Sequence, residues 1–127
     1  MNRLFWICLG GAAGTGARYL LSGWLLAALG MAFPYGTLAA NLIGSFLLGA
    51  IMHVALTTNW IAPTLRLALT TGIMGGFTTY STFNYETLQY LRQEAWGLVA
   101  WNLGATVVGC LAAGMAGLAL ARWWIGA

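Results

Sequence analysis

Charged side chains are scarce in this sequence, which contains no lysine and no aspartate. Only 6% of its 127 residues are charged, whereas soluble globular domains carry about 25%. Hydrophobic residues make up 61%, and the mean hydropathy is +0.81. A water-soluble domain could not cover its surface with so few charges. The composition therefore predicts an integral membrane protein whose surroundings are the lipid bilayer.

The lack of charge also excludes whole classes of function. Five arginines are scattered along the chain and form no basic patch or arm, so we expect no nucleic-acid binding. One histidine, His53, and two glutamates about two turns apart provide neither a triad nor a metal cluster, so we expect no enzyme. Cys8 and Cys110 lie inside apolar runs without disulfide or metal spacing and are predicted to be buried.

Long apolar runs separated by helix breakers account for nearly the whole chain. About 20 helical residues span a hydrocarbon core of about 30 Å, and Pro34 and Pro63 fall between runs. The sequence predicts one all-α membrane domain, residues 1–127, with both termini on one side and four transmembrane helices near residues 4–29, 36–56, 64–92 and 95–124. Too few arginines flank them to set one orientation, so insertion both ways is possible.

Tryptophans give an independent indication of where these helices end. Indole rings favour the membrane interface. Trp101 lies about a turn inside its predicted helix, whereas the others lie near predicted helix ends: Trp6, Trp24, Trp60, Trp96, Trp123 and Trp124.

The third predicted helix contains an irregular stretch rich in glycine and threonine. Gly72, Gly75 and Gly76 precede Thr78 and Thr79. This pattern predicts a broken helix whose free backbone carbonyls could coordinate a cation. The alternative is a simple kink in which hydroxyl groups satisfy the backbone.

Polar side chains in the first two helices allow two interpretations each. Thr37, Asn41 and Ser45 are spaced four apart and share one helix face. Asn41 could form a hydrogen bond between helices, or this face could line an anion pathway, because amide and hydroxyl groups donate without adding charge. Arg18 could extend toward the interface to anchor its helix, or attract an anion into a water-filled vestibule.

Beyond the glycines, hydroxyl groups and rings share one face of the third helix. Thr79, Thr82, Phe83 and Glu86 fall on this face, with Tyr80 beside Phe83. Ring edges carry the positive part of the aromatic quadrupole and could hold a small anion, although plain packing of the two rings is the alternative. An ionised Glu86 would repel an anion, so we expect it near a mouth, protonated or hydrogen-bonded.

These residues resemble the signature of the Fluc (CrcB) fluoride channel family. The segment 75–83, GGFTTYSTF, followed by Glu86, is similar to its third-helix motif. The segment 10–14, GGAAG, leading to Arg18, and the segment 36–44, GTLAANLIG, resemble its first and second helices. The resemblance covers essentially the whole chain.

The resemblance implies an antiparallel, dual-topology homodimer in the cell (inner) membrane, with multi-pass subunits. Such a protein passes fluoride passively out of the cytoplasm through two pores and relieves fluoride toxicity. By position, Asn41, Tyr80 and Phe83 would line the fluoride pathway, with Thr37, Ser81, Thr82 and Glu86 as polar companions. The carbonyls of Gly75 and Thr78 would bind a structural Na+ at the dimer interface, and Arg18 would match the family's first-helix arginine.

Two positions depart from the family pattern. Tyr80 stands where phenylalanine is more frequent, so either its ring edge or its hydroxyl could face the anion. Cys110 stands where serine is frequent, and Thr106 one turn earlier could substitute for it.

Two other functions remain as alternatives. A proton-coupled antiporter like the small multidrug exporters would need a carboxylate in its binding pocket, but the first helix has none and Glu86 is the single intramembrane acid. A non-transporting membrane subunit would explain the glycine-rich faces but not the polar stripe. A flux that does not respond to pH would separate a channel from an antiporter.

Overall fold

The computed structural model describes residues 2–126, and its regular secondary structure is helical. Three helices are unbroken, and a fourth stretch is divided into four segments. The unbroken helices are α1 (Asn2–Leu29), α2 (Tyr35–Thr57) and α6 (Trp96–Ile125). The divided stretch contains α3 (Pro63–Leu67), the π-helical η1 (Ala68–Met74), α4 (Gly75–Phe77) and α5 (Tyr80–Arg92). The predicted all-α architecture is therefore confirmed.

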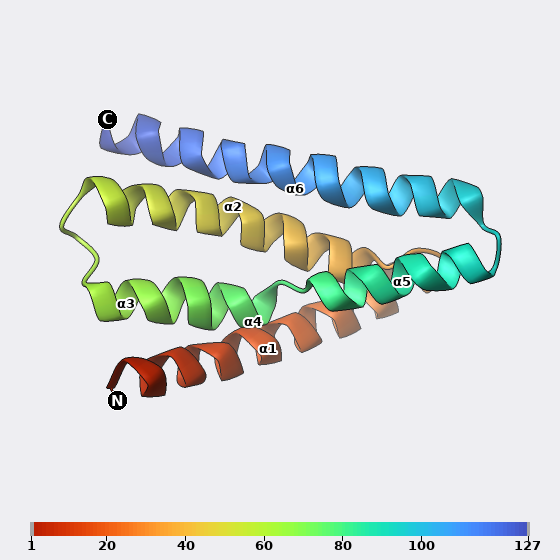
Figure 1. Ribbon diagram of the computed structural model, residues 1–127, viewed down its shortest axis with the longest axis horizontal. Helices are drawn as coiled ribbons and strands as arrows, with labels where there is room; N and C mark the ends of the chain where they lie inside the picture. The colour runs from red at the N-terminus through yellow and green to blue at the C-terminus, as the bar shows by residue number, and fades with distance from the viewer. Residues whose placement is uncertain (1, 127) are drawn as a thin grey trace.

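The helices run antiparallel to their neighbours in sequence, so the described ends of the chain lie at the same end of the bundle (Figure 1). The breakers act where the sequence places them. Gly30 follows α1 with a φ of +83°, a left-handed conformation that ends a helix without strain only at glycine. Pro63 is the first residue of α3, where its missing N–H costs no hydrogen bond.

The divided stretch changes its packing partner along its length. η1 and α4 pack mainly against α1, whereas α5 packs against α6 and, less extensively, α2. Within the described residues, the backbone of α1 does not closely approach that of α5 or α6. The segment between α4 and α5 is therefore the point at which the chain passes from one helix pair to the other.

Glycines let the most extensively packed pair, α2 and α6, approach closely. A Cβ atom at Gly117 would collide with the backbone of Phe46 and Ala50, and one at Gly49 would collide with the backbone of Gly114. Small residues at such crossings allow backbones to touch, which is how helices gain packing energy in lipid. The same close approach recurs where Gly10 of α1 meets η1.

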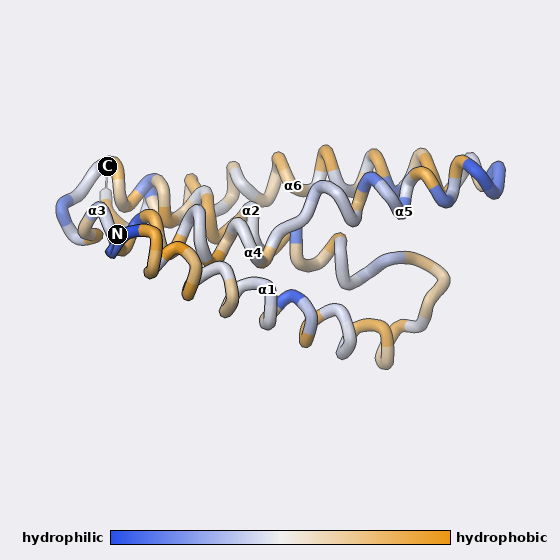
Figure 2. Tube along the Cα trace, turned by 60° about the horizontal axis from the view of Figure 1, so that its bottom comes forward, coloured by the Kyte–Doolittle hydropathy of each residue, from blue (hydrophilic) through white to orange (hydrophobic). Residues whose placement is uncertain are grey.

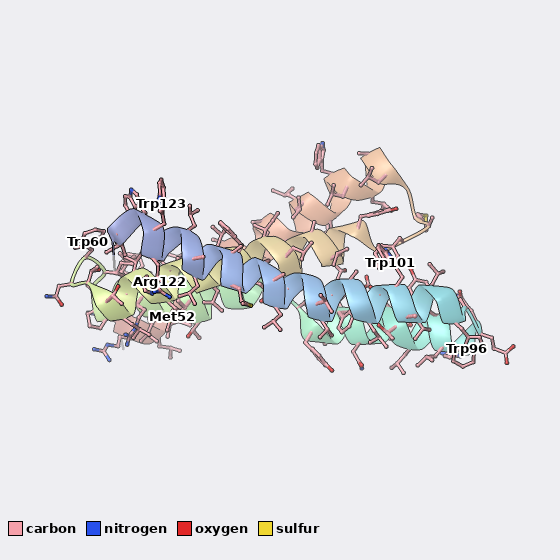
Figure 3. The ribbon with its side chains drawn as sticks, turned by 90° about the horizontal axis from the view of Figure 1, so that it is seen from above. Met52, Trp60, Trp96, Trp101, Arg122 and Trp123 are labelled. Carbon is pink, nitrogen blue, oxygen red and sulfur yellow. The ribbon has the colours of Figure 1, made fainter. Side chains whose placement is uncertain are left out.

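Apolar side chains cover much of the outside of the bundle. Hydrophilic residues gather at the turn between α5 and α6 and along α5, while α1, α2 and α6 are more hydrophobic (Figure 2). By length and composition, α2 and α6 could each cross a membrane. Trp60 and Trp123 lie at one end of the bundle, Trp96 lies at the other, and Trp101 lies further in (Figure 3).

The two cysteines were predicted to be buried, but neither is. Cys8 is exposed and Cys110 is partly exposed, and both are free thiols. The prediction failed for Cys8 because an apolar run indicates a helix in lipid as readily as a helix in a protein core. Side chains on the outer face of such a helix stay exposed however apolar they are.

The close approach of α2 and α6 leads to a test with a matched control on one helix. Gly117→Ala forces the backbones apart and is expected to reduce stability by about 1–3 kcal/mol. Gly104→Ala introduces the same methyl group into open space and is expected to be neutral or slightly stabilising. Thermal unfolding in detergent, followed by tryptophan fluorescence, measures both. Equal unfolding temperatures for the two variants would contradict the packing described here.

Candidate functional site

The site is built around two threonines at which the divided stretch leaves the helical conformation. Thr78 has φ −91° and ψ 157°, and Thr79 has φ −151° and ψ 121°, so both are extended. The glycines before them keep helical backbone: Gly72 lies in η1, and Gly75 and Gly76 lie in α4. β-branched residues such as threonine suit extended backbone better than helix.

One side-chain amide, that of Asn41, pairs with the backbone of the extended segment. The Thr79 N–H donates to Oδ1 of Asn41 at 2.8 Å, and Nδ2 of Asn41 donates to the Thr79 carbonyl at 3.1 Å. Asn41 lies on α2 and is 7% exposed. Leaving both backbone groups unpaired in this setting would cost several kcal/mol, roughly 1–3 for each group. Asn41 thus stabilises the extended conformation by pairing with both backbone groups.

Further polar groups satisfy the two helix ends that flank the extended segment. The Thr79 hydroxyl caps α5 by accepting from the Thr82 N–H at 3.3 Å. The Thr78 hydroxyl donates to the Met74 carbonyl at 2.8 Å. Nε of Arg18, on α1, donates to the Gly76 carbonyl at 3.1 Å. The Arg18 side chain therefore joins α1 to the C-terminal end of α4, a contact that neither of its two interpretations included.

Two backbone carbonyls at the segment lose their usual helical donors. In an uninterrupted helix, the amides of Thr79 and Thr82 would donate to the carbonyls of Gly75 and Thr78, four residues earlier. Here those amides donate instead to Oδ1 of Asn41 and to the Thr79 hydroxyl. The carbonyl oxygens of Gly75 and Thr78 are therefore available to another partner. Hard cations such as Na+ prefer oxygen ligands of this kind.

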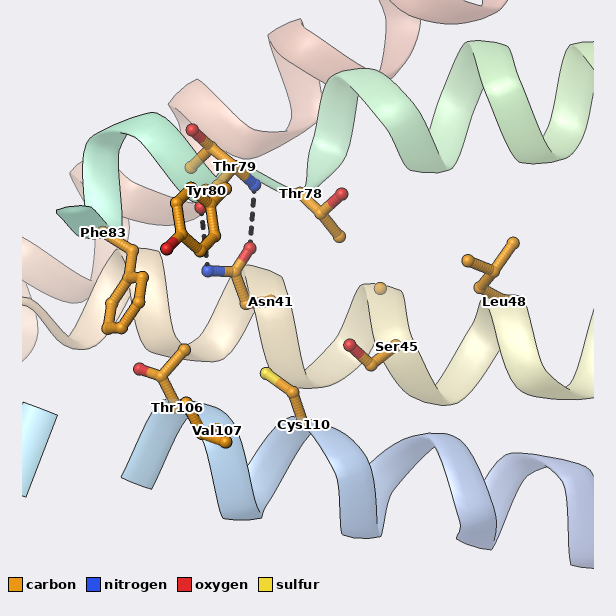
Figure 4. A pocket seen from close by; sticks show the side chains of 11 residues that line it. Asn41, Ser45, Leu48, Thr78, Thr79, Tyr80, Phe83, Thr106, Val107 and Cys110 are labelled. Atoms are coloured by element: carbon orange, nitrogen blue, oxygen red, sulfur yellow. Dashed lines mark hydrogen bonds between the residues drawn. The ribbon is translucent and has the colours of Figure 1, made fainter. Parts of the chain in front are cut away.

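A cavity of about 330 Å³ opens beside the segment, between α2, α5 and α6. The three residues predicted to line an anion pathway all lie in its wall: Asn41, Tyr80 and Phe83. Figure 4 shows Asn41 and Ser45 entering from α2, and Thr106 and Cys110 from α6. Its full lining is Asn41, Gly44, Ser45, Leu48, Thr78, Thr79, Tyr80, Phe83, Thr106, Val107 and Cys110.

The two aromatic rings of the cavity meet edge to face. The centroids of Tyr80 and Phe83 are 5.8 Å apart with an interplanar angle of 70°. Phe83 is 5% exposed, whereas Tyr80 is 76% exposed. Phe83 is thus held by its surroundings in this chain, while most of the Tyr80 ring faces outward.

Glu86 and Thr37 lie together but line a different cavity. The Thr37 hydroxyl donates to Oε2 of Glu86 at 2.8 Å, while Oε1 is buried without a hydrogen-bond partner in the described chain. Their cavity, of about 180 Å³, also involves the end of α1 and the loop before α2. Ser81 is exposed, and the Thr82 hydroxyl is close to that of Thr79 at 3.2 Å. The predicted polar companions therefore do not all share one cavity.

Sequence reasoning missed a buried polar pair at the interface of α5 and α6. Asn102 is 1% exposed and Thr87 is 6% exposed. Nδ2 of Asn102 donates to the Thr87 hydroxyl at 2.9 Å. The signal was present, because Asn102 is the one amide side chain in the largely apolar α6. An amide in lipid must find a partner.

The cavity combines neutral hydrogen-bond donors with aromatic rings, and its lining includes no Glu, His or Arg side chain. Hydroxyl groups of Ser45 and Thr106 can turn their hydrogens toward an occupant. The edge of the Phe83 ring adds partial positive charge. Such a lining can replace the water around a small anion without a fixed countercharge that would trap it.

Comparison with known proteins identifies the family of the chain. The sequence profile of the family described as CrcB-like protein, Camphor Resistance (CrcB), matches residues 5–118. The chain belongs to the CrcB family. The matched part of this CrcB protein contains both cavities and the extended segment between α4 and α5.

Curated relatives of this CrcB protein are named fluoride-specific ion channel FluC. One from Sorangium cellulosum (strain So ce56) is 57% identical over 122 residues, which are 96% of each chain. Another, from Anaeromyxobacter dehalogenans (strain 2CP-1 / ATCC BAA-258), is 55% identical over 126 residues, 99% of this chain and 100% of the relative. A third, from Geobacter sulfurreducens (strain ATCC 51573 / DSM 12127 / PCA), is 48% identical over 122 residues, 96% and 98%.

The pairing of Asn41 with Thr79 predicts a local change in hydrogen exchange. Asn41→Leu removes both partners of the Thr79 backbone, so exchange of a peptide covering residues 78–82 should become at least about tenfold faster. Asn84→Leu, at an exposed position of α5, is the matched control and should leave this exchange unchanged. Mass spectrometry of the detergent-solubilised protein measures both. Unchanged exchange in Asn41→Leu would show that the pairing is not what holds the segment.

Proposed function

We propose that this protein is a passive, fluoride-selective ion channel that exports fluoride from the cytoplasm and relieves fluoride toxicity. The observation that carries this proposal is the cavity at the extended segment, lined by neutral donors and the Phe83 ring. Membership of the CrcB family and the names of the curated relatives support the identity of the ion. This function is that of a channel rather than an enzyme.

The geometry suggests how fluoride would be favoured over larger anions. Because both polar atoms of the Asn41 amide are already bonded to Thr79, this amide would form part of the cavity wall and would not turn toward the ion. Rotatable hydroxyl groups and the edge of Phe83 would then replace part of the hydration shell of the ion. Fluoride holds its water more strongly than chloride, so it needs many short contacts to replace that water. A small site that provides such contacts would favour fluoride.

The same proposal includes a membrane arrangement. The three unbroken helices and the divided stretch would cross the cell (inner) membrane as a multi-pass protein, and two copies would associate as an antiparallel, dual-topology homodimer. Support comes from the apolar outer surface and from the exposure of Tyr80, whose ring is 76% accessible in one chain. A second chain packed against Tyr80 would complete the wall of the cavity and produce two equivalent pathways.

A structural Na+ at the dimer interface is also part of the proposal. The fit rests on the carbonyls of Gly75 and Thr78, whose usual amide donors are engaged elsewhere. Gly75 is exposed on the surface of the chain, where a second copy could approach. These oxygens would supply hard, neutral ligands, and the ion would hold the two extended segments together.

Fluoride efflux from liposomes tests the proposed function. The purified protein should release fluoride rapidly under a voltage driving force, without chloride release and with little change between pH 6 and pH 8. Phe83→Ile should lower the fluoride rate by at least about a hundredfold, because the ring edge would no longer help to replace the water around the ion. Phe5→Ile, at a 61% exposed ring on α1, is the control. Absence of fluoride flux from folded protein would refute the channel, and flux driven by a proton gradient would favour the antiporter.

Removal of sodium tests the cation site separately. Exchange of Na+ for N-methylglucamine at constant ionic strength should lower the unfolding temperature by several degrees, because a ligand that binds only the folded state stabilises it. Returning Na+ should restore the original value in a concentration-dependent way. An unfolding temperature that does not depend on Na+ after exhaustive dialysis would rule out the proposed site, whatever the result of the flux assay.

A further inference from the structure

A second polar contact lies one helical turn beyond Phe83. Nδ2 of Asn102, on α6, donates to the Thr87 hydroxyl at 2.9 Å, and this hydroxyl donates to the Phe83 carbonyl at 2.9 Å. A threonine hydroxyl has one hydrogen. Since that hydrogen goes to Phe83, the hydroxyl can only accept from Asn102, and the direction of both bonds is settled.

Two contacts flank the aromatic residue of the cavity, one at the start of α5 and one within it. Phe83 and Thr87 are four residues apart on one face of α5, and Thr79, the extended residue that caps α5, lies four residues before Phe83. Asn41 of α2 holds the backbone at Thr79, and Asn102 of α6 holds the helix at Thr87. Each amide therefore fixes α5 about one turn from Phe83, on opposite sides of it.

This arrangement matters because α5 has few other restraints. It packs against α6 and α2 and accepts one hydrogen bond from Thr37 at Glu86, whereas its backbone does not closely approach that of α1 within the described residues. Rotation of α5 about its axis would carry the Phe83 ring out of the cavity and bring its neighbours in. A hydrogen bond is directional, whereas apolar packing against α6 tolerates small rotations. A buried, directional contact at Thr87 is suited to preventing such rotation.

We propose that Asn102 and Thr87 are positioning residues that set the orientation of the Phe83 ring and thereby the anion selectivity of the cavity. This inference rests on the proposed channel function. Neither residue lines the cavity that contains Phe83, so their effect on the ion is indirect. A purely structural role would instead predict lower stability with unchanged selectivity.

The test compares fluoride and chloride efflux rates in liposomes for four variants. Thr87→Val keeps the shape of the side chain but removes the hydroxyl, and Asn102→Leu removes the amide donor. Both should lower the ratio of fluoride to chloride rates by about tenfold or more. Thr87→Ser restores the hydroxyl and should recover the wild-type ratio. Thr70→Val is the matched control, because the Thr70 hydroxyl makes the same kind of bond, to the Arg66 carbonyl at 2.7 Å, away from the cavity.

The double variant of Thr87→Val with Asn102→Leu adds a second criterion. If the two residues act through one contact, the double variant should have the same ratio as the worse single variant. Wild-type ratios in both single variants, failure of Thr87→Ser to recover the ratio, or an equal loss in Thr70→Val would each overturn the proposal. If Asn102→Leu does not fold, Asn102→Ser, with a smaller polar side chain, takes its place under the same criteria. Absence of fluoride flux in the wild type would instead refute the channel itself.

Discussion

Pairing between the Asn41 side chain and the Thr79 backbone is the interaction on which the rest of the site depends. An extended segment inside a helix leaves a donor and an acceptor without helical partners, and lipid offers no water to satisfy them. An asparagine amide presents one donor and one acceptor side by side, which is the pattern of a strand edge. α2 thus provides for Thr79 what a neighbouring strand would provide in a sheet.

Once the segment is extended, three other features follow from it. The chain can leave α1 and continue beside α6, which divides the bundle into two pairs of helices. The cavity lies beside the extended segment, between α2, α5 and α6. The carbonyls of Gly75 and Thr78 are released because their amide donors have other acceptors. Arg18 keeps the end of α4 from unwinding further by donating to Gly76. A single local conformation therefore produces the wall of the cavity and leaves the carbonyl oxygens of Gly75 and Thr78 without their helical donors.

Much of the fold could be predicted because apolar runs and prolines mark helix limits in a membrane protein. The expected ranges differ from the helix bounds in the structure by one or two residues at most ends. The ring pair of Tyr80 and Phe83 also followed from helical spacing. In contrast, the extended residues are threonines, and the glycines before them stay helical, with Gly72 and Gly76 packed closely against α1. Local conformational freedom alone could not distinguish these two uses of glycine.

Other features of the site depend on tertiary register, which one sequence does not specify. Thr37 and Asn41 share a face of α2, yet Thr37 contacts Glu86 in one cavity and Asn41 reaches Thr79 in another. Asn102 was visible as an isolated amide, but its partner depends on how α5 and α6 are aligned. The sequence therefore indicated which residues need polar partners, and the structure identified those partners.

The irregular backbone of the divided stretch, α3 to α5, affects its length along the bundle axis. Pro63–Arg92 contains as many residues as the continuous helix Trp96–Ile125 that returns beside it. The wider π-helical turns of η1 shorten the stretch, since they place more residues in each turn. Each extended residue instead advances about 3.3 Å, against 1.5 Å in an α-helix, so Thr78 and Thr79 add roughly 4 Å. Contraction and extension offset one another, so a stretch interrupted at its centre can still match the thickness spanned by an ordinary helix.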